Sequence, residues 1–337
     1  MKPIVRSKRR NSFRSLYLSI TLLFFCSTST YSQSPPLPSA SPSAPGQSRL
    51  FAKTELVVLP VSVTDADGNF VSGLSQQDFH VYEDGHLQRV TSFHEGDNPV
   101  TVGLIVDHSR SMAPNLQEVA GAVSAFAQSS NSQDEMFVVD FNDDVSVELM
   151  NGKAFSNDPK ELAKAVSSVR ARGRTALYDA VAEGIVHLQL GHWDKKALIV
   201  VSDGGDNASQ HKSSEVLALA QRSQVVIYSI GLVDPNEENE EENPDALRRL
   251  SKETGGIAFF PMSLENVADI SKRIARDLRE QYTLGFVPEK TGTADSFRQI
   301  RVKVDAPGHG KLHVRTRSGY FRSEQKQAPA KPGKSAS

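Results

Sequence analysis

The chain has 337 residues, 38% of them hydrophobic, and its formal net charge at pH 7 is −2. This length suggests about two domains, and the hydrophobic fraction is sufficient for packed cores. The balanced charge argues against a nucleic-acid-binding protein, because such proteins usually carry a strong excess of basic residues.

The amino terminus has the features of a secretory signal. Basic residues precede an apolar stretch from Leu16 to Phe25, and small polar residues follow it up to Ser32. The apolar stretch is about ten residues long, which is short of the roughly 20 residues that cross a bilayer as a stable helix. We therefore expect export to the periplasm or the extracellular space, with removal of residues 1–32 as a signal peptide and no membrane span in the mature chain.

The sole cysteine, Cys26, follows the bulky Phe25, where lipoprotein signals need a small residue, so we expect no lipid anchor. Once the signal is removed, the mature protein has neither a thiol nor a disulfide, and its stability depends on packing. Residues 33–50 are rich in Pro and Ser and are predicted to form an extended linker. Residues 323–337 are predicted to be a disordered tail.

Residues 51–98 show the alternating apolar and polar pattern of antiparallel strands. The alternation occurs in ELVVLPVSVTD, FHVYEDG and QRVTSF, with turn signals at Asp67-Gly68-Asn69 and Asp84-Gly85. The run from Asp65 to Gly68 resembles the start of a calcium loop. Its Gly is misplaced for an EF-hand, however, and no Glu closes the loop at the twelfth position, so a hairpin turn is the favoured interpretation.

Residues 99–280 change to alternating strands and helices. Uninterrupted apolar runs indicate strands that are covered on both faces, as in a mostly parallel sheet. These runs are Val100–Val106, Met136–Phe141, Ala197–Val201 and Val225–Ile230, with helical patterns such as Leu116–Phe126, Pro159–Val169 and Ala176–Leu188 between them. The segment Val145–Met150 is predicted to return antiparallel after a turn at Asn142-Asp143. The pattern predicts a doubly wound α/β sheet.

Residues 281–322 return to the strand pattern, in YTLGFVP, FRQIRVKVDA and KLHVRTRSGYF. Neither strand-rich segment is large enough to be stable alone. We expect the two segments to pair into one small antiparallel β-sandwich, with the α/β domain inserted between its halves. The alternative is a series of separate modules, in which the leading strands fold by themselves.

Oxygen-bearing side chains occur in three separate parts of the α/β block. Asp107, Ser109 and Ser111 lie in IVDHSRSM, Thr175 lies in RGRTALYD and Asp203 lies in LIVVSDGGDN. Each follows a predicted strand or begins a helix, and such positions meet at the carboxyl edge of an open α/β sheet. Carboxylates and hydroxyls with no nearby Cys or His at ligand spacing suit Mg²⁺, with Mn²⁺ or Ca²⁺ as alternatives, rather than zinc.

The order Asp-x-Ser-x-Ser, then Thr, then Asp resembles the metal-ion-dependent adhesion site of the von Willebrand factor type A (VWA) domain. The resemblance implies that Ser109 and Ser111 bind the ion directly, and that Asp107, Thr175 and Asp203 bind it directly or through water. It also implies that the ion keeps one coordination position for a carboxylate, Asp or Glu, of a protein partner. The segments Tyr-Thr-Leu-Gly-Phe and Arg-Ser-Gly-Tyr-Phe resemble a bacterial VWA-related group described from acidobacteria, so that the likeness extends over about residues 51–322.

Other polar residues near this motif have two interpretations. Asp179 is either a hydrogen-bond acceptor behind the ligands or a carboxylate at a helix start. Arg172 and Arg174, with Arg170, either line a solvated loop or steer an acidic ligand toward the ion. His108 is expected at the surface, pointing away from the ligands. The acidic run Asp234–Glu242 is expected to be a solvated loop.

The sequence therefore predicts an exported binding module that is not an enzyme. The leading alternative is a metal-dependent hydrolase or phosphatase that uses the same ion, suggested by Asp203-Gly204-Gly205-Asp206, although a second carboxylate cluster is missing. A structural envelope protein is the third possibility. No serine-hydrolase elbow, nucleotide-binding P-loop or dinucleotide-binding glycine motif occurs.

Overall fold

The computed structural model describes residues 56–147, 149, 152–233, 242–288 and 296–322. The predicted signal peptide, linker and carboxyl-terminal tail lie outside the described residues, as does the acidic run except for Glu242. All described residues belong to one compact unit. Within them, no helix has both the length and the apolar character needed to cross a bilayer.

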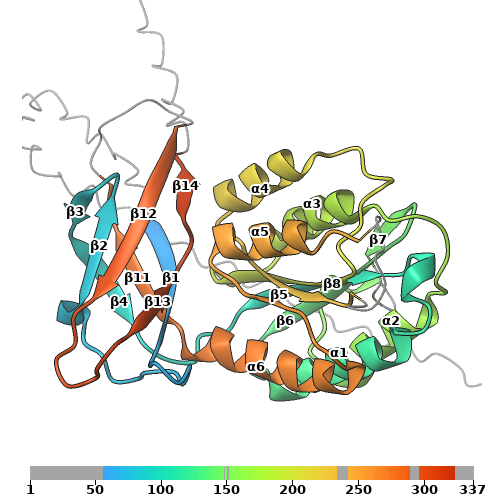
Figure 1. The fold of residues 1–337 in the computed structure, drawn as a ribbon, viewed down its shortest axis with the longest axis horizontal. Helices are drawn as coiled ribbons and strands as arrows, with labels where there is room; N and C mark the ends of the chain where they lie inside the picture. Colours follow the sequence, from blue (N-terminus) through green and yellow to red (C-terminus); the bar gives the residue numbers. More distant parts are fainter. Residues whose placement is uncertain (1–55, 148, 150–151, 234–241, 289–295, 323–337) are drawn as a thin grey trace, which may run out of the picture. The chain divides into compact units, whose positions relative to one another are not determined.

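A six-stranded sheet forms the centre of the α/β domain, in the order β10-β9-β8-β5-β6-β7 (Figure 1). Its strands are β5 (Thr101–Asp107), β6 (Glu135–Phe141), β7 (Val145–Val147), β8 (Lys196–Ser202), β9 (Val226–Gly231) and β10 (Ala258–Phe259). All neighbouring pairs are parallel except β6 with β7, which is antiparallel. The predicted doubly wound sheet and its antiparallel return are confirmed.

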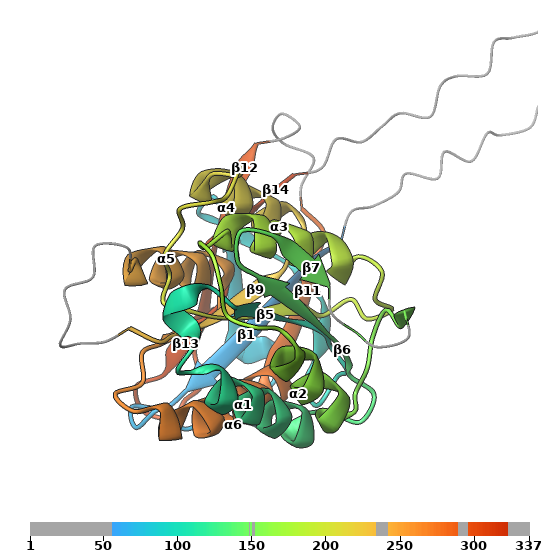
Figure 2. The ribbon, with the colours of Figure 1, turned by 90° about the vertical axis from the view of Figure 1, so that its right-hand side faces the viewer.

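Helices cover both faces of this sheet, as Figures 1 and 2 show from two directions. One face packs against α1 (Leu116–Ser129), α2 (Pro159–Ser168) and α6 (Val267–Glu280). The other face packs against α3 (Leu177–Leu188), α4 (Ser213–Arg222) and α5 (Pro244–Thr254). Short 3₁₀ helices occur at Gln76–Asp78, Arg110–Met112 and Leu264–Asn266.

The central strand β5 shows why its sequence forms a doubly covered strand. Every residue of β5 is buried. Val102, Leu104 and Val106 pack into the core on the α1 side, whereas Ile105 packs on the α3 side, as the two-residue period of a strand requires. A Cβ atom at Gly103 would lie 2.6 Å from side-chain atoms of both Leu198 and Phe137, so a glycine is needed here.

Two four-stranded antiparallel sheets form the second domain, in the orders β13-β1-β11-β4 and β14-β12-β2-β3. Their strands are β1 (Val57–Thr64), β2 (Phe79–Glu83), β3 (His86–Gln88), β4 (Val90–His94), β11 (Tyr282–Phe286), β12 (Phe297–Val304), β13 (His313–Arg315) and β14 (Gly319–Phe321). Inward-facing residues of both sheets share one core. Strand β1 pairs with β11, with Leu59 opposite Leu284. Strands before and after the α/β domain therefore pair, as the predicted fold class requires.

The turn after β1 is the predicted hairpin turn. The carboxylate of Asp65 accepts hydrogen bonds from the backbone N–H groups of Asp67 and Asn69, at 2.9 and 2.8 Å. Gly68 has φ +83°, which glycine adopts at low cost. Beyond the turn, the N–H of Val71 bonds to the carbonyl of Val63. The Asp65 carboxylate thus closes the turn itself.

A buried polar cluster joins the two domains around Asp277 of α6. Its carboxylate accepts hydrogen bonds from the hydroxyls of Ser62 on β1 and Tyr228 on β9, at 2.8 and 2.7 Å, and from the guanidinium of Arg315 on β13. Gln281 donates to both hydroxyls. Because Asp277 is 2% exposed, its charge depends on Arg315 for neutralisation.

Candidate metal centre

The residues of the predicted metal motif lie at the carboxyl edge of the six-stranded sheet. Asp107 is the last residue of β5, Ser111 lies in the 3₁₀ turn that follows, and Asp203 directly follows β8. Because β5 and β8 are parallel neighbours, their carboxyl ends lie side by side. Thr175 precedes α3.

Hydrogen bonds connect the β5 and β8 loops directly. The Ser111 hydroxyl donates to Asp203 Oδ2 at 2.7 Å, and the Ser109 and Ser111 hydroxyl oxygens are 3.1 Å apart. Asp107 accepts from the backbone N–H of Ser109 at 2.8 Å and from the hydroxyl of Ser202 at 2.6 Å. Four of the five predicted residues thus form one hydrogen-bonded set.

The Thr175 loop is fixed against both of these loops by its backbone. The N–H of Arg172 donates to the carbonyl of His108 at 2.8 Å. The Thr175 N–H donates to the side-chain oxygen of Asn207 at 2.9 Å, and the Asn207 N–H returns a bond to the Thr175 carbonyl at 3.0 Å. The fold therefore brings the three segments that carry the motif to one edge of the sheet.

Burial makes this edge unfavourable for negative charge. Asp107 is fully buried, and Asp203 and Thr175 are 6% and 7% exposed. Burial raises the pKa of Asp107 to about 6, hydrogen bonds from Ser109 and Ser202 oppose this rise, and the nearby charge of Asp203 adds to it. A cation would remove this electrostatic cost, and buried carboxylate and hydroxyl oxygens are the donors that hard divalent ions take. The residues present therefore fit such an ion.

Asp179 lies in the first turn of α3 and holds the loop that follows Asp203. Its carboxylate accepts from the backbone N–H groups of Gln210 and His211, both at 2.9 Å, and from the His211 ring at 2.7 Å. Neither donor is a motif residue, and the position of Asp179 in the first turn of α3 agrees with its interpretation as a carboxylate at a helix start.

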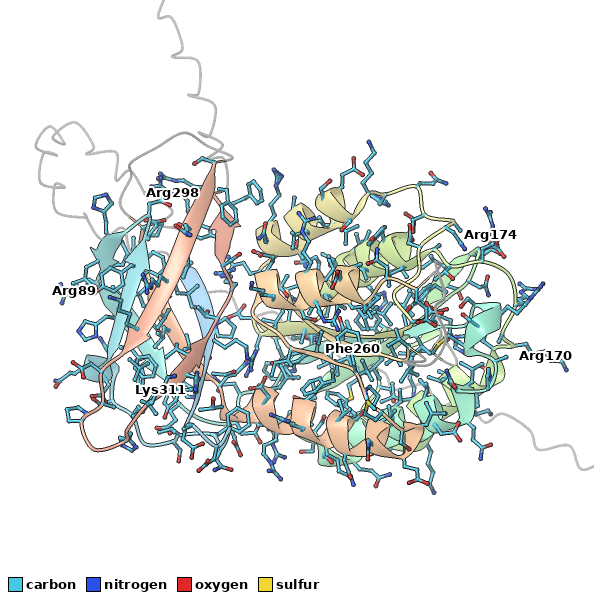
Figure 3. All side chains as sticks on the ribbon, in the orientation of Figure 1. Arg89, Arg170, Arg174, Phe260, Arg298 and Lys311 are labelled. Carbon is cyan, nitrogen blue, oxygen red and sulfur yellow. The ribbon has the colours of Figure 1, made fainter. Side chains whose placement is uncertain are left out.

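The arginines before Thr175 differ in their partners. Arg174 forms an ion pair with Asp143 at 2.9 Å, and both side chains are largely exposed. Arg170 and Arg172 are exposed. Figure 3 shows Arg170 and Arg174 extending outward at the same end of the α/β domain. Arg174 is thus engaged with Asp143, whereas Arg172 has no ion-pair partner among the described residues.

The expectation that His108 lies at the surface is wrong. Its side chain is fully buried, and its ring bonds to the carbonyl of Val166 at 2.9 Å and to Asp140 Oδ1 at 2.9 Å. Burial alone would lower the pKa of His108, but the hydrogen bond and charge of Asp140 outweigh burial and raise the pKa. Neither of these ring partners is a motif residue, and Val166 belongs to α2.

The sequence interpretation missed two residues that support the motif, Ser202 and Asn207. Ser202 precedes Asp203 and bonds to Asp107 across the sheet, and Asn207 holds Thr175. Both lie in the stretch SDGGDN, in which only Asp203 matches the metal motif. In the described part of the chain, no group of three or more His, Cys, Asp or Glu side chains is placed to hold a metal ion. A metal ion bound at this edge would be held by hydroxyls as well as carboxylates.

Comparisons with known proteins agree with this architecture. The family model described as von Willebrand factor type A domain matches residues 102–273, which are 172 of the 337 residues. No curated protein sequence matches the chain.

Three solved structures illustrate the similarity. One is von Willebrand factor type A from Catenulispora acidiphila, with 13% identity, TM-score 0.47 and coverage of 74% of each chain. The conserved hypothetical protein BatB from Bacteroides thetaiotaomicron has 17% identity and TM-score 0.44, covering 53% of this chain and 98% of that chain. Proximal thread matrix protein 1 from the mussel byssus, with a zinc-occupied MIDAS motif, has 15% identity and TM-score 0.47, covering 59% and 50%.

Proposed function

Because the chain belongs to the von Willebrand factor type A domain family, we propose that its α/β domain binds a protein partner through a divalent ion at the carboxyl edge of the sheet. Domains of this family commonly bind protein partners. In this proposal Asp107, Ser109, Ser111, Thr175 and Asp203 hold the ion, which is Mg²⁺ under cellular conditions. The ion supplies a positive centre that accepts an Asp or Glu side chain of the partner.

The hydrogen bond from Ser111 to Asp203 is the observation that carries this proposal. It joins the β5 and β8 loops at 2.7 Å, beside the fully buried carboxylate of Asp107. Two carboxylates and three hydroxyls carry less negative charge than an all-carboxylate site. A bound divalent ion would therefore retain attraction for a further anion.

Binding without catalysis is favoured by the surroundings of the motif. A hydrolase that uses a bound ion needs a group that accepts a proton from water beside that ion. His108 is the histidine nearest in sequence, but its ring is buried and bonded to Asp140 and Val166. Export of the chain, with removal of residues 1–32, remains part of the proposal and would place the partner in the envelope or outside the cell.

The test is retention of partners from the envelope fraction of the source cell on the immobilised protein. We expect retention in MgCl₂ and loss in excess EDTA. Thr175→Ala should weaken retention about tenfold or more, because the hydroxyl no longer contributes to the ion. Ser167→Ala removes an exposed hydroxyl that donates to the Ala163 carbonyl within α2, and should bind normally. Equal retention with and without EDTA would contradict the proposal.

A further inference from the structure

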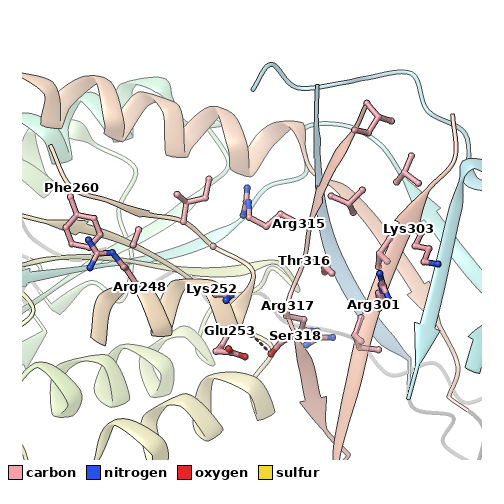
Figure 4. Close-up of a pocket in the computed structure, with 18 residues that line it drawn as sticks. Arg248, Lys252, Glu253, Phe260, Arg301, Lys303, Arg315, Thr316, Arg317 and Ser318 are labelled. Atoms are coloured by element: carbon pink, nitrogen blue, oxygen red, sulfur yellow. Dashed lines mark hydrogen bonds between the residues drawn. The ribbon is translucent and has the colours of Figure 1, made fainter. Parts of the chain in front are cut away.

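A second polar feature, separate from the metal motif, is a cleft of about 1030 Å³ (Figure 4). Its walls come from α5 and β10 of the α/β domain and from β12 and β13 of the sandwich. Most of its charged side chains are basic: Arg248, Lys252, Arg301, Lys303, Arg315 and Arg317. Glu253 is the single acidic side chain that lines it, among the described residues.

Only part of this positive charge is neutralised. Arg248 pairs with Asp245 at 2.9 Å, and Arg315 pairs with Asp277. Lys252 and Arg301 are exposed and have no ion-pair partner among the described residues. The cleft therefore retains a net positive charge that its own side chains do not compensate.

Arg317 is the most unusual of these cations because it is buried. It is 4% exposed, and it donates from Nη2 to the carbonyl of Val58 at 2.6 Å. Its Nε and Nη1 atoms have no hydrogen-bond partner in the described part of the chain. Burial lowers the pKa of Arg317 to about 10, which leaves it protonated at neutral pH. A buried cation without a carboxylate raises the attraction of the cleft for an anion.

The cleft also has apolar surface and open strand edges. Ile300, Val302, Val314 and Phe260 contribute to its lining. Strands β10 and β13 are each the end strand of their sheet. The pairing of β12 with β14 stops at Gln299, so that the following residues of β12 have no strand on that side among the described residues. Open edges of this kind can pair with an extended peptide.

We propose that this cleft binds an extended acidic segment of a partner protein. The uncompensated cations attract carboxylates, the apolar surface takes alternate side chains, and the strand edges supply backbone hydrogen bonds. The cations favour an acidic occupant over a neutral one, and the apolar lining favours a peptide over an inorganic anion. None of the lining residues belongs to the metal motif, so this binding does not require a divalent ion.

The test is fluorescence anisotropy of the full chain with a fluorescein-labelled decapeptide of alternating Glu and Val, measured in EDTA. We expect saturable binding of this peptide and none of the matching Lys and Val peptide. The double variant Lys252→Ala/Arg301→Ala should weaken binding about tenfold, because both residues line the cleft, are exposed and have no ion-pair partner among the described residues. Arg89→Ala/Lys311→Ala removes the same charge from exposed positions of the sandwich outside the cleft and should bind normally (Figure 3).

Several outcomes would overturn the proposal. One is equal weakening by both double variants, which would indicate attraction by net charge alone. A second is binding only when Mg²⁺ is present, or its loss in Asp107→Ala, which would assign the peptide to the metal motif. A third is binding of inorganic polyphosphate through the same arginines more tightly than the peptide. Unchanged affinity for a peptide N-methylated at alternate residues would also contradict strand pairing.

Discussion

The α/β domain and the β-sandwich of this protein build their cores in different ways. Both cores of the α/β domain are made from one continuous stretch of chain, between Val100 and Leu278. The sandwich core combines residues from Val57 to Val90 with residues from Tyr282 to Tyr320. The difference indicates that the α/β domain holds the information for its own fold, whereas the sandwich needs both of its halves at once.

This comparison has a consequence for function. The α/β domain meets the sandwich through α6, whose Asp277 bonds to Ser62 and Arg315. The metal motif lies instead on loops that follow β5 and β8 and precede α3. Further hydrogen bonds join the sandwich to the end of α5, where the carbonyls of Glu253 and Gly255 accept from Ser318 and Arg315. The motif residues take no part in these contacts.

The largest expected effect comes from separating the two regions. The fragment Val100 to Arg279 should fold alone and bind Mg²⁺. The fragment Thr54 to His94 should remain unfolded until Gln281 to Phe321 is supplied, because an isolated small sheet is marginal in water. The measurement is NMR signal dispersion of each fragment. A well-dispersed spectrum from the leading fragment alone would refute the interdependence of the halves.

The next largest effect is expected in the buried polar cluster around Asp277. Asp277→Ala should lower the free energy of unfolding by about 3 to 5 kcal/mol, because it leaves the Arg315 charge and the Tyr228 hydroxyl without their acceptor. Urea denaturation measures this change. Asp269→Ala on the same helix is the control, since its ion pair with Lys272 is exposed. A loss below about 1 kcal/mol for Asp277→Ala would mean that this polar cluster contributes little to stability.

A pH effect distinguishes the metal motif from the rest of the fold. The pKa of Asp107 is raised to about 6, so that without metal its ionisation opposes folding as the pH rises from about 4 to 6. In EDTA, Asp107→Asn should therefore be about 1 to 3 kcal/mol more stable than the native chain at pH 7.5. At pH 4, where the native Asp107 is protonated when folded, this advantage should disappear. Thermal unfolding at both pH values tests the sign of this stability difference. An Asp107→Asn variant that is less stable than the native chain at pH 7.5 would contradict the prediction.

The smallest effect is expected at the surface. Arg174→Ala breaks the pair with Asp143, whose partners are 65% and 40% exposed. Such pairs contribute little, so the free energy of unfolding should change by less than about 1 kcal/mol. Urea denaturation of both variants compares the loss in Arg174→Ala with the loss in Asp277→Ala. If Arg174→Ala lowered the free energy of unfolding as much as Asp277→Ala, this loop would contribute to stability as strongly as the buried polar cluster.

Local patterns allowed much of the fold and of the metal motif to be predicted from sequence. The β5 strand is a continuous apolar run that ends at Asp107, and the position of Ser109 and Ser111 follows from it. The antiparallel segments were recognisable because alternate residues such as Val57, Leu59 and Val61 face one core. Each of these signals lies within one element of the chain.

Features that depend on distant segments could not be predicted in this way. His108 is buried because α2 covers it, which the sequence around His108 does not show. In the sequence, Arg317 is one of several basic residues in KLHVRTRSGYF. Its burial depends on packing near Val58, whose carbonyl it contacts from a distant part of the chain. Asp277 is likewise one of several acidic residues in an amphipathic helix, and the sequence does not show that it pairs with Arg315.

Calorimetric titration of MgCl₂ into the full chain tests the central claim most directly, with Asp107→Ala and the exposed control Asp158→Ala measured alongside. The account predicts one saturable site in the native chain and in Asp158→Ala, and no binding by Asp107→Ala, whose unfolding in EDTA remains cooperative. Equal Mg²⁺ affinity in Asp107→Ala would contradict it, because the ion would then be held by other residues.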